Sequence, residues 1–308
     1  MFLSKKYVSI TILLFLVGLN IYAQELPVKA GNIVELCYQF KFKTADSLMA
    51  VYFSEIKQGE ELELYMLKAN IYWWKIISGI NDKTTKANYY KALAKAEAYF
   101  DKEKETETET GAAYLYKGIT LYGYMARMDG LNKNYLQAFL RVNSCLKYLE
   151  KSFGSETKYP FFYLSSGLYN YHIVVTAKKY PMLAPYLYLY PKGDKKKGVE
   201  YLQTAAKNSN KYLSTEGNYF LMKIYLEEKN YDKALQHINV LIERFPQNAI
   251  FIYYKFYIYL HSNNQKESVG MEARLINELK KNTQINANQI AHFESLIKED
   301  NINYNKQK

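Results

Sequence analysis

The chain has 308 residues, a formal net charge of +11, and few glycines (14) or prolines (6). It is too long for one compact core of short elements and suits an elongated array. A basic balance is typical of proteins that bind nucleic acids or membranes, but no RNA- or DNA-binding motif occurs and the lysines are scattered. We therefore expect a solvated basic surface and no nucleic-acid partner, with weak attraction to an anionic membrane or envelope polymer as the alternative.

The N-terminus has the order of a secretory signal peptide. Lys5 and Lys6 precede an apolar run over 8–19, and the sequence Ile-Tyr-Ala ending at Ala23 offers a small-residue cleavage site before Gln24. The run is shorter than the roughly 20 residues of a bilayer span, although an uncleaved anchor is the alternative. We expect cleavage after Ala23, a mature chain without a transmembrane span, and a periplasmic or secreted location.

The chain has two cysteines, Cys37 and Cys145. An exported protein meets an oxidising environment in which two thiols can pair. In an array of helical repeats, however, each repeat contacts chiefly its neighbours, and these two residues are far apart in sequence. We therefore expect two small buried apolar residues within helices rather than a disulfide.

Apolar residues recur with the helical period almost throughout, so the chain is predicted to be all-α, with consecutive antiparallel helix pairs. In chain order, we expect pairs over 32–42 and 44–56, 61–77 and 85–100, 108–128 and 131–151, 161–178 and 194–208, 215–248, and 249–261 and 266–281. Gly118 is expected at a close helix contact. A polar closing helix over 286–298 would cap the array. The segment 301–308 is expected to be a disordered tail.

The fourth pair is interrupted by an insertion over 180–193. Pro181, Pro185 and Pro191 exclude one regular helix through it. Leucines alternate with tyrosines here, so a short extended segment would place leucines on one side and tyrosines on the other. The insertion is expected either to pack over an apolar seam or to present an exposed edge to a partner or a membrane surface.

The segment 215–248 fits one helix-turn-helix unit. Tyr225 is a bulky residue near the end of a first helix, and Ala234 is a small residue early in a second helix, so the two backbones can approach closely. Asn230 is expected to cap the second helix. Ile238 supplies an apolar residue within that helix, and Pro246 ends it.

These residues match the 34-residue pattern of the tetratricopeptide repeat, and the segment resembles a member of that family. The Trp and Gly of the family's first helix are replaced by Asn218 and Met222, so the match is partial. The resemblance implies a right-handed superhelical solenoid over 24–300, with about six helix pairs and a C-terminal capping helix. Such a scaffold binds other molecules along a curved face.

In this family the first helix of each pair lines a concave groove. The resemblance places Tyr219, Lys223, Tyr253 and Tyr257 at outward positions of these helices. Looser alignments add Asn70, Trp73, Tyr122, Tyr171 and His172, and the insertion adds Tyr186, Tyr188 and Tyr190. Tyrosine suits a binding face because it combines a large rigid area with a hydroxyl, but it suits packing between helices equally well.

No motif indicates catalysis. The four histidines show no HExxH spacing, there is no GxSxG sequence or phosphate-binding glycine loop, and neither cysteine has a papain-like setting. We expect no metal, no cofactor and no enzymatic activity. The leading hypothesis is an exported scaffold that binds a protein or peptide partner in the cell envelope. A glycan-binding envelope protein is the alternative, and an enzyme with an unrecognised site is the third.

Overall fold

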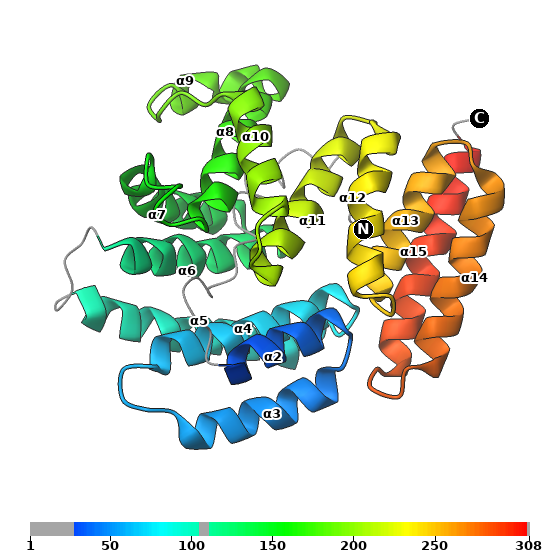
Figure 1. Ribbon diagram of the computed structural model, residues 1–308, viewed down its shortest axis with the longest axis horizontal. Helices are drawn as coiled ribbons and strands as arrows, with labels where there is room; N and C mark the ends of the chain where they lie inside the picture. Colours follow the sequence, from blue (N-terminus) through cyan, green and yellow to red (C-terminus); the bar gives the residue numbers. More distant parts are fainter. Residues whose placement is uncertain (1–27, 105–110, 307–308) are drawn as a thin grey trace. The chain divides into compact units, whose positions relative to one another are not determined.

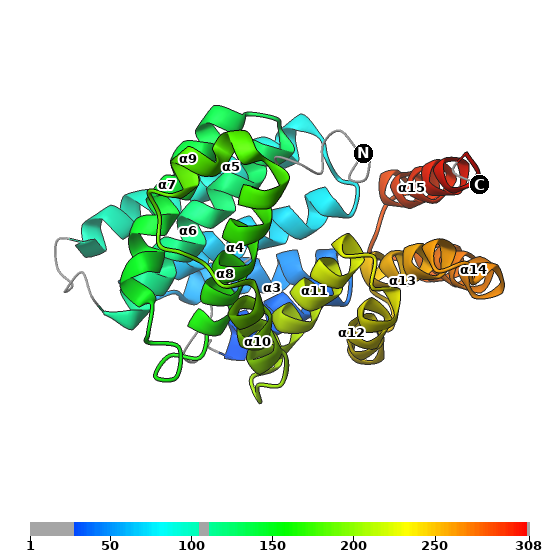
Figure 2. The same ribbon diagram turned by 90° about the horizontal axis from the view of Figure 1, so that it is seen from above.

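The computed structural model describes residues 28–104 and 111–306. These ranges contain helices and no strand, which confirms the all-α prediction (Figures 1 and 2). The expected signal peptide lies outside them. The α-helices are α2 (Val28–Tyr38), α3 (Phe42–Glu55), α4 (Glu61–Ile77), α5 (Lys83–Lys104), α6 (Ala112–Leu131), α7 (Tyr135–Ser152), α8 (Phe162–Lys179), α9 (Ala184–Leu187), α10 (Lys195–Ala206), α11 (Lys211–Glu227), α12 (Tyr231–Arg244), α13 (Ala249–His261), α14 (Gln265–Lys281) and α15 (Ala287–Asn305).

The described chain divides into two compact units. Unit 1 contains residues 93–220, and unit 2 contains residues 25–92 together with 221–308. The boundaries fall inside α5 and α11. A single array over 24–300 was expected from the sequence, whereas the N-terminal and C-terminal helices belong to one unit and the central helices to the other.

Glycines bring helices of unit 1 together. In this unit α6 packs on α7 and α8 packs on α10 (Figure 1). A Cβ atom at Gly118 of α6 would lie 2.6 Å from the Tyr148 ring of α7, which confirms the predicted close contact. A Cβ atom at Gly198 of α10 would lie 2.6 Å from the backbone nitrogen of Tyr171 in α8. Only glycine permits that backbone approach.

The insertion differs from the extended segment that we predicted. It forms a short 3-10 helix, η2 (Pro181–Leu183), followed by the single turn α9. Pro181 and Pro185 lie in the first turn of these elements, where a helix leaves its backbone N–H groups unbonded and a proline loses no hydrogen bond. Asp194 then begins α10, because its carboxylate accepts hydrogen bonds from the backbone nitrogens of Lys196 and Lys197 at 2.8 and 3.1 Å.

In unit 2, helices from opposite ends of the sequence pack together. The Asn248 amide donates to the Tyr38 carbonyl at 2.7 Å, and the Tyr38 ring stacks on Phe245 with centroids 4.9 Å apart. The Gln289 amide donates to the Ser78 hydroxyl at 2.8 Å. Helices of this unit still pack chiefly on their sequence neighbours, as expected. The bonds between distant segments come in addition to these contacts.

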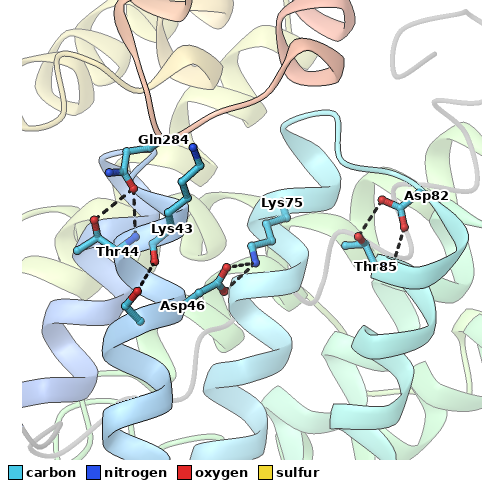
Figure 3. A network of polar contacts seen from close by, with 8 residues as sticks. Lys43, Thr44, Asp46, Lys75, Asp82, Thr85 and Gln284 are labelled. Carbon is cyan, nitrogen blue, oxygen red and sulfur yellow. Dashed lines mark hydrogen bonds and ion pairs between the residues drawn. The ribbon is translucent and has the colours of Figure 1, made fainter.

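A second group of bonds joins α3 to the segment that precedes α15 (Figure 3). The Gln284 side-chain oxygen accepts from the Thr44 backbone nitrogen at 3.1 Å and from its hydroxyl at 3.2 Å. The Lys43 ammonium donates to the Thr283 carbonyl at 2.8 Å. Figure 3 also shows Lys75 of α4 paired with Asp46 of α3 at 2.6 Å. The bonds of Lys43 and Thr44 hold α3 against the C-terminal segment of unit 2, and the Lys75–Asp46 pair joins α4 to α3.

The helix pair expected over 215–248 is present as α11 and α12. The Asn230 side chain caps α12 by accepting a hydrogen bond from the Lys233 nitrogen at 3.2 Å, as predicted. Ala234 and Ile238 are buried, and the Tyr225 ring stacks on His237 with centroids 5.6 Å apart. The sequence therefore identified the turn and the buried side of this pair correctly.

The predicted tail is wrong over residues 301–305. Helix α15 continues to Asn305, beyond the expected end at 298. Tyr304 is buried, and its hydroxyl donates to the Asn263 side-chain oxygen at 2.6 Å. Because Tyr304 lies one helical turn after the buried Asp300, the two side chains fix the last turns of a segment whose composition is otherwise polar.

Cys37 and Cys145 are both free and buried, as expected. Burial raises the pKa of each thiol. Over the ranges that the structure describes, no helix is both long and apolar enough to cross a membrane.

Candidate recognition site

Partly exposed side chains of α11, α12 and α13 contribute aromatic and basic groups to a surface of unit 2, which we call the tyrosine face. It consists of Lys223, Tyr231, Tyr254, Tyr257 and His261, all of which are partly exposed. Tyr254, Tyr257 and His261 follow one another at helical spacing along α13, so they project from the same side of the helix.

One end of the tyrosine face is formed by Lys223 and Tyr254. The Lys223 nitrogen lies 3.1 Å from the Tyr254 hydroxyl and 4.7 Å from the centroid of the Tyr254 ring. An ammonium at this distance from an aromatic ring is attracted to its π face. The contact joins α11 to α13 and keeps a positive charge beside an aromatic surface.

The other end of the tyrosine face is centred on His261. Its ring centroid lies 4.1 Å from Tyr257 and 6.5 Å from Tyr231. Burial, and to a smaller extent the charge of Lys229, lowers the pKa of His261. The imidazole is therefore mostly neutral at pH 7 and serves as an aromatic and hydrogen-bonding group.

Asp300 of α15 supports this surface from the buried side. The carboxylate is buried and accepts a hydrogen bond from the Tyr253 hydroxyl. Burial raises the pKa of Asp300 to about 6, although the Tyr253 hydrogen bond acts in the opposite direction. Burial and the nearby Asp300 charge also raise the pKa of Tyr257, so this phenol stays protonated as a hydrogen-bond donor.

The sequence placed Tyr219, Lys223, Tyr253 and Tyr257 at outward positions of first helices. Lys223 and Tyr257 are partly exposed. Tyr253 is not an outward residue, however. It is 6% exposed, because its hydroxyl bonds to Asp300 while its ring packs near Phe256 and Phe293 at centroid distances of 6.2 and 6.3 Å. Tyr253 therefore holds α15 against α13 and does not present its ring to a ligand.

Two other predicted residues, Tyr171 and His172, are also buried rather than outward. They are 1% and 4% exposed and belong to α8 of unit 1. Tyr171 lies where Gly198 lets α10 approach. Burial lowers the pKa of His172 to about 3, so its imidazole is neutral at physiological pH. The expected groove position is wrong for both, because α8 is packed on several sides and its buried residues surround most of the helix.

The remaining predicted residues do not join the tyrosine face. Tyr219 is partly buried in the unit 1 part of α11, with its ring 5.5 Å from Phe220. Trp73 lies on α4 with its ring 6.4 Å from Tyr89. Tyr188 is 80% exposed, and Tyr190 is partly buried. The side chain of Tyr186 lies outside the described part of the structure.

The predicted set lacked three members of the tyrosine face, Tyr231, Tyr254 and His261, and its supporting residue Asp300. Tyr254 and His261 could have been found from their spacing around Tyr257 on one helix. No sequence pattern pointed to Asp300, because it lies beyond the predicted end of the last helix. Within the described ranges, no cluster of three or more His, Cys, Asp or Glu side chains could hold a metal ion.

The surface as a whole offers three phenol rings, one ammonium and one imidazole, with a single supporting carboxyl. Such a set suits recognition of apolar, aromatic and anionic groups by contact and hydrogen bonding. Comparisons with known proteins give no further information: no family model, no curated protein and no solved structure matches the chain.

Proposed function

We propose that the protein is an exported, non-catalytic scaffold of tetratricopeptide-like helix pairs that binds a protein or peptide partner of the cell envelope through the tyrosine face. The consecutive helix pairs, the partial repeat pattern over 215–248 and the signal-like N-terminus support this proposal. In this proposal the helix pairs follow the right-handed superhelical path of the repeat family.

The observation that carries the proposal is the chemistry of the tyrosine face. Tyr254 and Tyr257 are partly exposed on α13, whereas Phe251, Tyr253 and Phe256 of the same helix are buried. Tyrosine side chains lose little entropy on binding and supply both apolar area and a hydroxyl. Their neighbours Lys223 and His261 add polar groups that can orient a partner.

The charges of the site favour a particular kind of partner segment. The Lys223 ammonium is the cation within the face, whereas Asp300 is buried behind it and bonded to Tyr253. An acidic side chain or a chain-terminal carboxylate of the partner would meet Lys223, and an apolar or aromatic side chain would lie against Tyr257. We therefore expect a peptide that places an apolar residue near an acidic group.

The test is a crosslinking capture from envelope fractions with the mature chain and a Lys223→Ala/Tyr254→Ala/Tyr257→Ala variant. A Val51→Ala/Val269→Ala variant is the control, because both valines are exposed apolar residues of the same unit. Circular dichroism first establishes that all three proteins are equally helical. A protein captured by the mature chain and the control but lost from the face variant supports the proposal.

Two results would count against this function. If both variants captured the same proteins, the tyrosine face would not be the surface that binds the partner. Retention of the mature chain in gels that contain envelope polysaccharide, abolished in the face variant, would show that the ligand is a glycan instead of a protein.

A further inference from the structure

Unit 1 has a row of exposed apolar side chains on α7. Leu136, Phe139 and Leu140 are 69%, 38% and 48% exposed. Their spacing places them on one side of the helix, while Ala138, Val142 and Cys145 on the opposite side are buried. Isolated apolar residues are common on protein surfaces, but a row at helical spacing indicates a surface that contacts something apolar.

The insertion extends this apolar row. Met182, Tyr188 and Leu189 are 80%, 80% and 81% exposed. The next residue, Tyr190, donates a hydrogen bond to the side-chain oxygen of Asn143. Asn143 lies one turn after Phe139 and Leu140 on the same side of α7. The hydrogen bond therefore places the exposed part of the insertion at the C-terminal end of the α7 row.

The insertion is also bordered by positive charge. Exposed lysines lie before the insertion on α8, near its end, and after it at the start of α10. They are Lys178, Lys179, Lys192, Lys195, Lys196 and Lys197. The acidic residue between them, Asp194, accepts hydrogen bonds from the backbone at the start of α10. Glu200 is one turn from Lys196, and the two charges lie 3.9 Å apart. The local charge is strongly positive, in the same sense as the net charge of +11.

We propose that this surface, which we call the insertion surface (Leu136, Phe139, Leu140, Met182, Tyr188 and Leu189 with the bordering lysines), binds an anionic lipid bilayer. Large aliphatic side chains and a tyrosine at an exposed edge can enter the interfacial region of a membrane, where apolar burial is favourable. Lysines beside them are attracted to anionic headgroups. The tyrosine face of unit 2 differs, because its groups are fixed by mutual contacts suited to a directional ligand.

Co-sedimentation of the mature chain with lipid vesicles tests this proposal. The vesicles are phosphatidylcholine alone or equal parts of phosphatidylcholine and phosphatidylglycerol. The first variant, Met182→Ser/Leu189→Ser, removes apolar groups that are almost fully exposed, so its fold should be unchanged. The second, Lys192→Gln/Lys195→Gln/Lys196→Gln, removes charge alone. Val269→Ser/Ile302→Ser is the matched control, with residues 59% and 43% exposed in unit 2.

We expect the mature chain and the control to bind the anionic vesicles, and to bind phosphatidylcholine at least about tenfold more weakly, with added salt reducing the binding. Both insertion variants should partition into anionic vesicles about tenfold less. In a Leu189→Trp variant, anionic vesicles should shift the additional tryptophan emission to shorter wavelength.

Three results would overturn the inference. The first is no binding of the mature chain to anionic vesicles. The second is equal binding by the Met182→Ser/Leu189→Ser variant, which would leave only non-specific charge attraction. The third is capture of a soluble protein through Leu189 while the vesicles stay unbound, which would make the insertion surface a protein interface.

Discussion

Both units consist of α-helices, but the contacts that hold the helices together within unit 1 differ from those within unit 2. In unit 1, helices close in sequence approach through glycines, as Gly198 of α10 approaches α8. In unit 2, side chains at the ends of helices bond to segments some 200 residues away, as Asn248, which caps α13, bonds to the Tyr38 carbonyl. The close approaches in unit 1 depend on glycines at a few positions. The distant contacts of unit 2 depend on polar side chains and on aromatic rings such as those of Tyr38 and Phe245. The two kinds of contact should therefore fail in different ways.

The largest effect is expected from enlarging a glycine of unit 1. A Cβ atom at Gly198 would lie 2.6 Å from the Tyr171 nitrogen and 2.7 Å from the Gly167 carbonyl oxygen. Both are backbone atoms, so α8 and α10 must move apart. We expect Gly198→Ala to lower the free energy of unfolding by about 3 kcal/mol. Chemical denaturation measures the loss, and amide hydrogen exchange should locate it in α8 and α10.

Gly270→Ala is the control for this substitution. Gly270 lies within α14, and a Cβ atom there would meet no atom within 4 Å. Alanine is the better helix former by about 1 kcal/mol, so this variant should be as stable as the natural chain or more stable. Equal losses from the two substitutions would contradict the close-packing explanation.

A smaller effect is expected when one distant contact of unit 2 is removed. Asn248 is fully buried, donates to the Tyr38 carbonyl at 2.7 Å and caps α13 by accepting from the Phe251 nitrogen at 3.1 Å. Asn248→Ala removes the cap and leaves a buried carbonyl without this donor, at a cost of about 2 kcal/mol. Faster hydrogen exchange in both α2 and α13 would show that the bond joins them.

Asn264→Ala tests whether any asparagine cap would have the same effect. Asn264 precedes α14 and is exposed, and its side chain makes no capping hydrogen bond. The variant should unfold at nearly the same denaturant concentration as the natural chain. A loss as large as that of Asn248→Ala would mean that the effect came from the helix start alone.

The third effect depends on pH and is about as large as the second. Burial raises the pKa of Asp300 from 3.8 to about 6. Between these values the folded chain binds more protons than the unfolded chain, so the contribution of Asp300 to stability falls as the pH rises through this window. Asp300→Asn removes this titration. Relative to the natural chain, the variant should gain about 2 kcal/mol between pH 4 and pH 7.

The Tyr253→Phe variant tests the same titration in a second way. The Tyr253 hydrogen bond holds the pKa of Asp300 down, so removing the hydroxyl should raise that pKa further and extend the pH-dependent window upward. Parallel pH profiles of stability for the natural chain, Asp300→Asn and Tyr253→Phe would contradict the assignment of this titration to Asp300.

Local patterns were enough to predict most helices. The structure has helices at Glu61–Ile77 and Ala249–His261, the two spans expected from their apolar spacing, and Asn230 caps α12 as its side chain chemistry suggested. The prediction that no single regular helix runs through the insertion was correct, but the extended segment predicted there was wrong. Pro181 and Pro185 instead begin short helical turns, a role that spacing alone did not distinguish.

The candidate site was predicted less well, for a physical reason. Outward and buried positions of a helix are distinguished by what packs on it, and α8 has buried residues around most of its circumference. Tyr171 and His172 therefore could not be placed without the partners of α8. Tyr253 was misassigned because its partner, Asp300, lies 47 positions later in a segment of polar composition.

The central proposal is that the tyrosine face of unit 2 binds a specific protein partner. Site-specific photocrosslinking in envelope fractions tests it most directly. The photoreactive residue p-benzoylphenylalanine replaces Tyr257 in one protein and Val269, an exposed residue of α14, in the other. We predict one specific protein adduct from position 257 that is lost when Lys223→Ala is added, and no such adduct from position 269. The same adducts from both positions, or none from position 257, would contradict the account.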